Sequence, residues 1–437
     1  MRSGRLRVLV LAGMVCAGGA GFLSAGCATG AAANDHVAPE VPMWFARPSG
    51  ALKLSFRRAL TAYSRKGGED YERGKPCLDP AHDRVFVGSS DHGLYALRAS
   101  GGSTLWRFET LGMVQSEPYY DAELDMVYFG SNDGALYAVK AENGQRVFRF
   151  DSAAEVSRRP VRVGANILFA SAADFLFAVD AKTGKEKWQV HRTSALGMEI
   201  AGHAGPAYDD KTGLVTMAYS DGHVVAYDGV TGSEKWPVDL AAEAEQKLGQ
   251  LPRYLDVDTT PVPGGTASNR VVFVASYAGG VYALDAKSGA RVWSNEQALG
   301  VTDLVFFEEE AKVSADRAVD PLKIVIASSA QTGLWGLEAD TGKVAWRNAV
   351  PEGGVTAPTR YAGAILVGTS RYGLFLISPR NGRVIDGIDT GNGILATPAA
   401  AGTRAFVMTN GGNLLGLQVD GPGSQPRARS QVSSFGF

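Results

Sequence analysis

The fold of this chain can be predicted from one segment, Phe175-Leu-Phe-Ala-Val-Asp-Ala-Lys-Thr-Gly184-Lys-Glu-Lys-Trp188. The segment contains a short apolar run, a turn that ends in glycine, and a tryptophan four residues beyond the glycine. Variants of its first ten or eleven residues occur eight times, at 93–102, 134–144, 175–184, 222–232, 279–289, 333–342, 373–382 and 412–421. The closing glycines lie 39 to 57 residues apart. This spacing indicates a repeat architecture with about four strands per unit.

Each part of the repeated segment has a physical explanation. The apolar run is expected to form a strand buried on both faces, because units of this kind stack sheet on sheet. Glycine closes the turn because a tight hairpin needs a residue with positive φ. The aromatic residue falls on an outer strand, where it can fill the space that widens between neighbouring sheets. These aromatic residues are Trp106, Phe148, Trp188, Trp236, Trp293 and Trp346, whereas the seventh copy has Asp386.

Two further features complete the unit and close the array. Seven copies have a proline before the next apolar strand, where a missing N–H costs little: Pro76, Pro118, Pro160, Pro206, Pro261, Pro358 and Pro398. The last copy lacks an outer strand, while a strand-like run at 51–57 has no hairpin of its own. We therefore predict an all-β fold over residues 48–421, an eight-bladed β-propeller of four-stranded antiparallel blades, closed by the N-terminal strand. Residues 306–322, with Glu308, Glu309 and Glu310, are expected to form an acidic loop insertion.

The N-terminus is typical of an exported protein. Residues 1–26 contain three arginines, an apolar stretch rich in glycine, and small residues before Cys27, so they are predicted to be a signal peptide. The end of this stretch resembles a bacterial lipoprotein box, which implies lipidation of Cys27 at the periplasmic face of the outer membrane. Ordinary secretion, with Cys27 incidental, is the alternative. Residues 27–47 are expected to be the lipidated cysteine and a flexible linker, and 422–437 a disordered C-terminal tail.

Composition and motifs disfavour several classes of function. Hydrophobic residues make up 45% of the 437 residues and charged residues 20%, which is typical of a packed globular chain. The net charge of −2 disfavours nucleic acid as a partner. The six histidines lack metal-ligand spacing, and neither a serine-hydrolase elbow nor a phosphate-binding loop is present. Cys77 is expected to be a packed side chain. We predict no catalytic, metal-binding or cofactor-binding residue.

The repeated segment resembles the PQQ-like repeat of quinoprotein-type β-propellers over nearly all of residues 48–421. Within that group, the stretch Arg253-Tyr-Leu-Asp256-Val-Asp258-Thr-Thr-Pro-Val resembles a Leu-x-Asp-Val-Asp-Thr-Thr-Pro-Val segment of the BamB family. In that family the two aspartates help to dock the third POTRA domain of BamA, which implies the same role for Asp256 and Asp258, with Arg253 nearby.

One repeat earlier, Met198-Glu-Ile200-Ala201-Gly stands where the family has Leu-x-Leu-Arg-Gly. Met198 and Ile200 keep the apolar pair, and Ala201 replaces the arginine. Residues two apart in an extended segment point the same way, so Met198 and Ile200 are expected to form a mixed docking patch with the two aspartates. The alternative is that the apolar pair packs under its loop and that Asp256 only accepts hydrogen bonds from turn amides.

The resemblance implies a non-enzymatic scaffold lipoprotein of the outer membrane β-barrel assembly (BAM) complex. The implied partners are BamA, through a POTRA domain, other BAM components, and unfolded outer membrane protein clients. No cofactor is implied. Because the same repeat occurs in PQQ-dependent dehydrogenases and in sensor propellers, a PQQ-binding redox enzyme or a ligand-sensing periplasmic propeller is the alternative. Many such enzymes use a disulfide between adjacent cysteines, which this chain cannot form.

Overall fold

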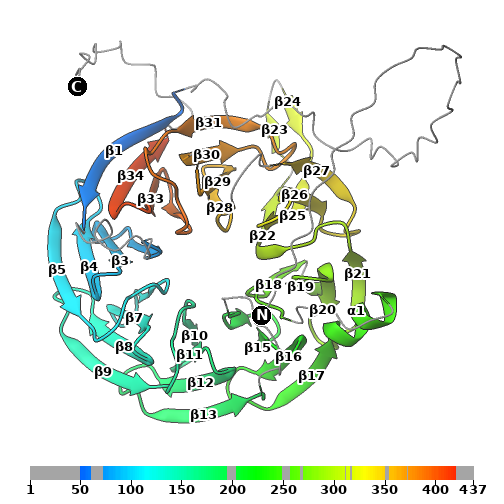
Figure 1. The fold of residues 1–437 in the computed structure, drawn as a ribbon, viewed down its shortest axis with the longest axis horizontal. Helices are drawn as coiled ribbons and strands as arrows, with labels where there is room; N and C mark the ends of the chain where they lie inside the picture. Colours follow the sequence, from blue (N-terminus) through cyan, green and yellow to red (C-terminus); the bar gives the residue numbers. More distant parts are fainter. Residues whose placement is uncertain are drawn as a thin grey trace, which may run out of the picture. The chain divides into compact units, whose positions relative to one another are not determined.

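Eight four-stranded antiparallel sheets follow one another around a ring in the computed structural model (Figure 1). The structure describes residues 50–60, 72–193, 203–248, 256–265, 269–310, 312–314, 317–349, 354–371 and 373–419. All of them belong to one unit, His36–Phe437. The prediction of an eight-bladed β-propeller is confirmed. The predicted signal peptide, linker and C-terminal tail, including Cys27, lie outside the described residues.

The strands of each blade are given below in order from the centre of the ring to its outside (Figure 1). Blades 1 to 4 contain β2 (Pro76–Asp79), β3 (Arg84–Gly88), β4 (Gly93–Arg98) and β5 (Thr104–Glu109); β6 (Tyr119–Asp121), β7 (Met126–Ser131), β8 (Ala135–Lys140) and β9 (Arg146–Asp151); β10 (Val161–Val163), β11 (Asn166–Ala170), β12 (Phe175–Asp180) and β13 (Glu186–His191); and β14 (Ala207–Asp209), β15 (Leu214–Ala218), β16 (His223–Asp228) and β17 (Glu234–Asp239).

Blades 5 to 8 contain β18 (Val262–Gly265), β19 (Arg270–Ser276), β20 (Gly280–Asp285) and β21 (Arg291–Asn295); β22 (Val301–Glu309), β25 (Leu322–Ser329), β26 (Gly333–Glu338) and β27 (Val344–Asn348); β28 (Thr359–Tyr361), β29 (Ala364–Thr369), β30 (Gly373–Ile377) and β31 (Val384–Ile388); and β32 (Ala399–Ala401), β33 (Arg404–Met408), β34 (Asn413–Val419) and β1 (Leu52–Ala59). Helix α1 (Leu240–Leu248) follows β17, and a hairpin of β23 (Lys312–Ser314) and β24 (Arg317–Val319) lies between β22 and β25.

The strand order defines two faces of the ring. Because consecutive strands are antiparallel, two sets of segments lie at the same face of the ring. They are the connections from one blade to the next and the turns between the second and third strands of each blade. We call this face the connection face. The turns between first and second strands, and between third and fourth strands, lie at the opposite face, which we call the turn face. Residues 256–260 therefore lie at the connection face, and the β23–β24 hairpin extends from the turn face.

Neighbouring blades are joined by an aromatic ring of one blade and a glycine of the next. Trp293 on β21 lies opposite Ala283, a small residue that leaves room for the indole, and its Nε1 donates a hydrogen bond to Ala339 O of blade 6 at 2.8 Å. Below the ring lies Gly342, whose φ is +70°, and a Cβ there would be 2.4 Å from Trp293. We call this arrangement the aromatic–glycine joint.

The aromatic–glycine joint recurs around the ring. The same contact, in which a Cβ added to the glycine would lie only 2.3 to 2.7 Å from the aromatic ring, occurs for Phe56–Gly102, Trp106–Gly144, Phe148–Gly184, Trp188–Gly232, Trp236–Gly289 and Trp346–Gly382. At each of these joints the aromatic ring of one blade thus packs against the glycine of the next blade. Truncation of a buried aromatic side chain of this size to alanine costs about 3–5 kcal/mol. Four of these residues are buried, Phe148, Trp236, Trp293 and Trp346, and the other three are half-buried.

Ring closure uses the N-terminal strand, as predicted. β1 pairs with β34, and Phe56 lies opposite Gly416, so Phe56 takes the aromatic position of the outer strand in blade 8 and covers Gly102 of blade 1. Sequence alone does not single out Phe56, because β1 is separated from the rest of its blade by almost the whole chain.

In blade 7 the larger residue of the facing pair is on β30 and the smaller one is on the outer strand β31, the reverse of the other blades. Where other blades pair a small residue with an aromatic residue, Leu376 lies opposite Asp386. Leu376 fills the core together with Leu52 and Leu417. The buried carboxylate of Asp386 accepts a hydrogen bond from Leu52 N at 2.7 Å, which fixes the start of the closing strand β1.

The expectation of an acidic loop at 306–322 is wrong for residues 306–309 and for Leu322, which belong to strands. Residues 306–309 continue β22, which pairs with β25 as far as Glu309↔Leu322. Glu308 forms an ion pair with Lys323 at 3.4 Å, and Glu309 forms one with Arg380 of blade 7 at 2.9 Å. The run of glutamates resembled a solvated loop because the cations that form ion pairs with it, Lys323 and Arg380, come from other parts of the chain.

The contribution of the joint to stability can be tested with two glycines. Gly342→Ala introduces a Cβ against Trp293, whereas Gly363→Ala, at a φ of +77°, meets nothing within 4 Å. Both substitutions carry the backbone strain of positive φ, about 1–2 kcal/mol. We expect Gly342→Ala to lower the free energy of unfolding in urea by roughly 1–3 kcal/mol more than Gly363→Ala. Equal losses would show that the indole moves aside without cost.

A second prediction concerns the closing strand. Asp386→Ala removes the acceptor of the Leu52 N–H, and we expect a loss of roughly 1–3 kcal/mol. Hydrogen exchange of β1 amides should become faster than in the parent protein. Ile385→Ala, at an exposed neighbouring position, should leave β1 exchange unchanged. Unchanged exchange in Asp386→Ala would mean that the pairing with β34 alone holds β1.

Candidate functional site

The predicted docking residues are only partly visible. Met198, Ile200, Ala201 and Arg253 lie outside the described residues. Asp256 and Asp258 lie in the segment 256–260 that precedes β18. The side chain of Asp256 is buried, with 2% exposed, and Asp258 is half-buried. Asp258 is therefore the carboxylate of the pair that a partner can reach more easily.

The segment 256–260 is held by backbone and hydroxyl hydrogen bonds. Thr259 Oγ1 accepts a bond from Ala275 N and donates one to Ala275 O, both at 2.9 Å. Val257 N donates to Tyr219 O at 3.3 Å, which joins the segment to blade 4. These contacts fix the backbone of the segment, so the direction of Asp258 follows from the fold and not from a free loop.

The described ends of the two predicted docking segments lie next to each other. Gly205 N donates a hydrogen bond to Thr260 Oγ1 at 2.9 Å. Arg158, in the connection before β10, donates from Nη2 to Asp258 O at 3.1 Å and from Nε to His203 O. Arg158 is not among the residues predicted from the sequence, although it joins residues 203–205 to residues 256–260.

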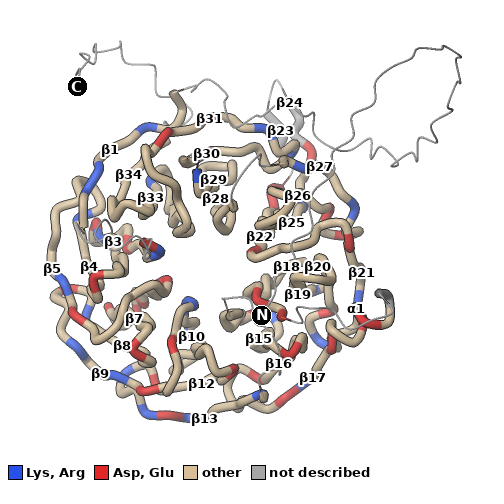
Figure 2. The backbone as a smooth tube through the Cα atoms, in the orientation of Figure 1, with Lys and Arg blue, Asp and Glu red and all other residues tan. Residues whose placement is uncertain are grey.

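Charges of both signs gather where the innermost strands begin. Lys75 precedes β2, and burial lowers the pKa of its amine, with a smaller contribution from the Arg158 charge; Asp303 acts in the opposite direction. Arg159 forms an ion pair with Glu117 at 3.3 Å. Basic and acidic residues are also interspersed around the whole ring (Figure 2). A mixed field of this kind suits polar contacts with a protein and does not favour polyanions.

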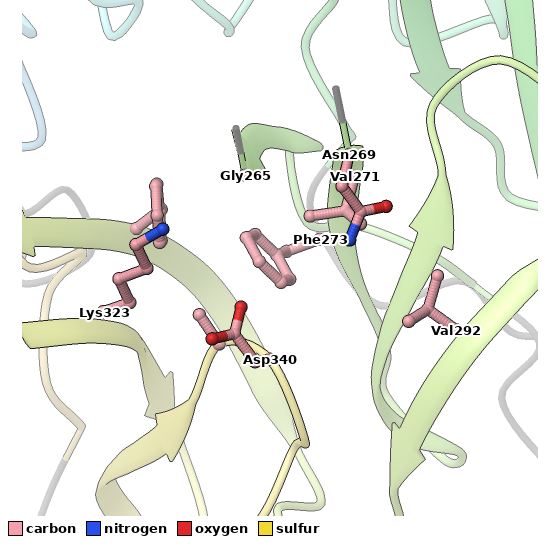
Figure 3. Close-up of a pocket in the computed structure, with 9 residues that line it drawn as sticks. Gly265, Asn269, Val271, Phe273, Val292, Lys323 and Asp340 are labelled. Atoms are coloured by element: carbon pink, nitrogen blue, oxygen red, sulfur yellow. The ribbon is translucent and has the colours of Figure 1, made fainter. Parts of the chain in front are cut away.

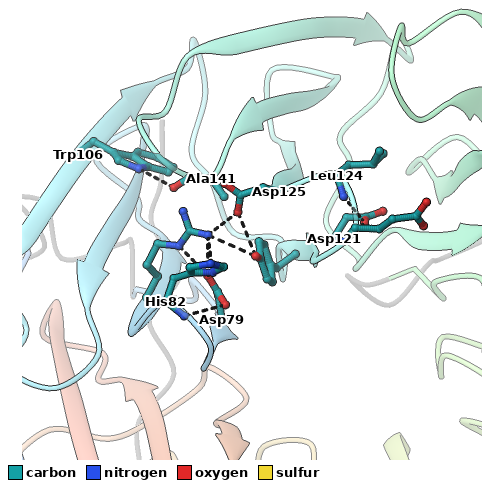
Figure 4. A network of polar contacts seen from close by, with 10 residues as sticks. Asp79, His82, Trp106, Asp121, Leu124, Asp125 and Ala141 are labelled. Atoms are coloured by element: carbon teal, nitrogen blue, oxygen red, sulfur yellow. Dashed lines mark hydrogen bonds and ion pairs between the residues drawn. The ribbon is translucent and has the colours of Figure 1, made fainter.

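One group of side chains in the described part of the chain has the composition of a metal site. Ligand atoms of Asp79, His82 and Asp125 lie within 4.8 Å of one another. However, the Arg84 guanidinium lies among them, donating to Asp79 Oδ2 at 2.7 Å and forming an ion pair with Asp125 of blade 2 (Figure 4). Burial tends to raise the pKa of Asp79, but the hydrogen bonds from Arg84 and His82 and the charge of Arg84 together outweigh it and hold that pKa below its usual range. The Arg84 guanidinium thus already supplies a positive charge to the two carboxylates, and the group connects blade 1 to blade 2.

A cavity of about 340 Å³ lies between blades 5 and 6 near the turn face (Figure 3). Its walls include Phe273 and Phe306, whose ring centroids are 5.5 Å apart, and the backbone of Gly265. β18 ends in Gly264 and Gly265, which have no side chains that could fill this space. The polar side chains of its lining are Asn269, Lys323 and Asp340, and Lys323 forms an ion pair with Glu308. We interpret the cavity as a gap in the packing between the two blades.

Cys77 is a packed side chain, as predicted. It lies on β2 with 8% of its surface exposed, and burial raises the pKa of its thiol to about 11. Among the described residues it is the free cysteine. A neutral, buried thiol is a poor nucleophile, so Cys77 supports the core and not chemistry.

Comparisons with known proteins point in one direction. A family model described as "Outer membrane protein assembly factor BamB" matches residues 93–309 and 278–425. The protein of that name from Legionella pneumophila (strain Paris) is 27% identical over 207 residues, which cover 47% of this chain and 48% of that protein. Polyvinylalcohol dehydrogenase from Sphingopyxis sp. (strain 113P3) is 24% identical over 305 residues, which cover 57% of this chain and 45% of that protein. The chain thus spans about half the length of these two relatives.

A solved structure supports the same fold. The crystal structure of BamB from Moraxella catarrhalis superposes with a TM-score of 0.64 at 19% identity, covering 84% of this chain and 99% of that one. At this identity the likeness shows the fold alone. None of the helices in the described ranges is long and apolar enough to cross a membrane.

The raised pKa of Cys77 leads to a prediction about reactivity. In a variant with Cys16 and Cys27 replaced by serine, a pKa of about 11 leaves on the order of 0.1% thiolate at pH 8. We expect Ellman's reagent to react very slowly with the folded protein and rapidly after unfolding in urea. Fast reaction of the folded protein at pH 8 would contradict the packed assignment.

Proposed function

The chain belongs to the family of outer membrane protein assembly factor BamB, and on this premise we propose that it is a non-enzymatic scaffold of the β-barrel assembly (BAM) complex. Lipidation at Cys27 would hold it at the periplasmic face of the outer membrane. Its direct partner is BamA, bound through a POTRA domain, alongside other components of the complex. Through this contact it assists the assembly and insertion of outer membrane β-barrel proteins.

The observation that carries the proposal is the contact between the ends of the two predicted docking segments. Gly205 follows one segment and binds Thr260, which ends the other. Both connections lie at the same face of the ring and belong to adjacent blades. A partner that touches the apolar residues Met198 and Ile200 could therefore also reach Asp258 without a change in the ring.

The chemistry of the proposed surface suits a small mixed contact. An apolar pair supplies the area that is removed from water, and a half-buried carboxylate supplies direction and discrimination. Asp256 contributes as a support of the segment, because its side chain is buried. The family's arginine at the position of Ala201 is missing, so the basic part of the contact would come from Arg253.

A PQQ-dependent redox enzyme is the second candidate, because one relative is a dehydrogenase. Such an enzyme would hold Ca²⁺ with converging carboxylate and amide oxygens next to the quinone. In the described residues the nearest approach to that donor set is the group of Asp79, His82 and Asp125, which Arg84 already bridges. These residues do not fit a quinone-bound calcium ion, so we favour the scaffold.

Co-purification tests the proposed partner site. The parent protein should recover BamA from a detergent extract, and Ile200→Asp combined with Asp258→Arg should reduce recovery at least tenfold, since both parts of the patch are reversed in character. Asp210→Arg is the matched control, because Asp210 lies at the turn face with 70% of its side chain exposed. Undiminished recovery by the double variant would mean that the partner binds elsewhere.

The enzyme alternative has its own test. The purified protein, supplied with PQQ, Ca²⁺ and a primary alcohol, should not reduce an artificial dye above the rate measured without the protein. Reduction that requires all three additions would overturn the scaffold proposal.

A further inference from the structure

The position of Arg158 breaks a rule that the repeat otherwise keeps. Two residues before the strand proline, six of the seven proline-containing copies have a small residue: Gly74, Ser116, Ala204, Thr259, Thr356 and Ala396. These residues are buried against their own blade. Ser116 Oγ, for example, accepts a hydrogen bond from Gly130 N at 2.9 Å. In blade 3 the same position is Arg158, whose side chain is too long to be accommodated in this way.

Arg158 instead reaches across three further blades. Its Nε donates to His203 O before blade 4, and its Nη2 donates to Asp258 O before blade 5 at 3.1 Å. Its Nη1 lies 3.6 Å from Asp303 Oδ1 on β22 of blade 6. The planar guanidinium offers several donors in a fixed arrangement, so one side chain can bind three acceptors at once.

The surroundings of Arg158 allow it to come this close. A Cβ on Gly205 would lie 3.0 Å from Arg158 Cβ and 3.1 Å from Thr260 Oγ1, so a glycine there leaves room for both. The Arg158 side chain is 17% exposed, and the Asp303 carboxylate balances its charge. Of the two carbonyls that Arg158 binds, that of Asp258 lies within one predicted docking segment, and that of His203 directly follows the other, which ends at Gly202.

We propose that Arg158 is a positioning residue of the partner-binding site, which holds residues 203–205 next to residues 256–260, where Asp258 lies. It does this through main-chain carbonyls and does not itself touch the partner. Segments that are ordered before binding lose less conformational entropy when the partner arrives, which raises affinity. This inference rests on the proposed function, because the segments matter only if they bind the partner.

The neighbouring residue provides a matched control. Arg159 is 47% exposed, pairs with Glu117, and lies over the ring of Tyr119, so its contacts are with blade 2 and the residues just before it. If Arg158 were only one more surface charge, replacing either arginine would have the same effect. A difference between the two therefore measures the bridge and not the net charge.

The test uses the full chain in detergent and the periplasmic part of BamA as the probe. We expect Arg158→Gln to weaken binding on the order of tenfold, with Arg158→Lys intermediate and Arg159→Gln within about twofold of the parent. Hydrogen exchange should accelerate at residues 203–205 and 257–260 in Arg158→Gln, while strands of blades 1 and 8 keep their protection. Unchanged affinity in Arg158→Gln, or an equal loss in Arg159→Gln, would overturn the inference.

Two further variants separate the possible causes of failure. If Asp258→Arg loses binding while Arg158→Gln binds like the parent, the inference fails and the proposed site stands. If neither variant loses binding, the proposed site itself is wrong. If Arg158→Gln does not fold, Asp303→Asn decides the question, because it removes only the charge that balances Arg158. Weaker binding with faster hydrogen exchange at residues 203–205 would support the bridge. Binding and exchange like those of the parent protein would exclude it.

Discussion

The stacking of an outer-strand aromatic ring on a glycine of the next blade is the interaction on which the rest of the structure depends. It requires a small residue opposite the ring within the blade, and a residue without a Cβ at positive φ in the next one. Since this contact joins each pair of neighbouring blades except 7 and 8, it sets the angle between sheets around most of the circle. The large buried core between sheets follows from this repeated angle.

Blades 7 and 8, where the ring closes, pack against their neighbours although their sequences differ from the other repeats. Phe56 comes from the other end of the chain, yet it faces Gly416 and covers Gly102 like any aromatic residue of the series. Blade 7 reverses the sizes of the facing residues, with Leu376 filling space and Asp386 holding Leu52. Closure thus joins the two ends of the array through packing, through the antiparallel pairing of β1 with β34, and through the buried hydrogen bond from Leu52 N to Asp386. The edge of β34 that would otherwise be unpaired is covered by β1.

A rigid ring of this kind has consequences for the connection face. Its connections begin at positions that the blades determine, so segments far apart in sequence, such as 203–205 and 256–260, become neighbours. A departure from the repeat that does not serve ring closure is a candidate for a functional role. Arg158 is such a departure, since it replaces a small buried residue with a bridge to two neighbouring connections and to Asp303. The Arg84 group, by contrast, joins blades 1 and 2 to each other.

The sequence by itself determined the number of blades and the strand boundaries near each glycine, because these depend on the periodicity of the repeat. The use of the N-terminal strand could also be predicted, because the last copy lacks an outer strand and the run at 51–57 has no hairpin of its own. The sequence did not determine that residues 306–309 are a strand, that Phe56 completes the ring, that Asp256 is buried while Asp258 is accessible, or that Arg158 bridges two connections. Each of these depends on which distant groups lie opposite one another, and only the closed ring brings those groups together.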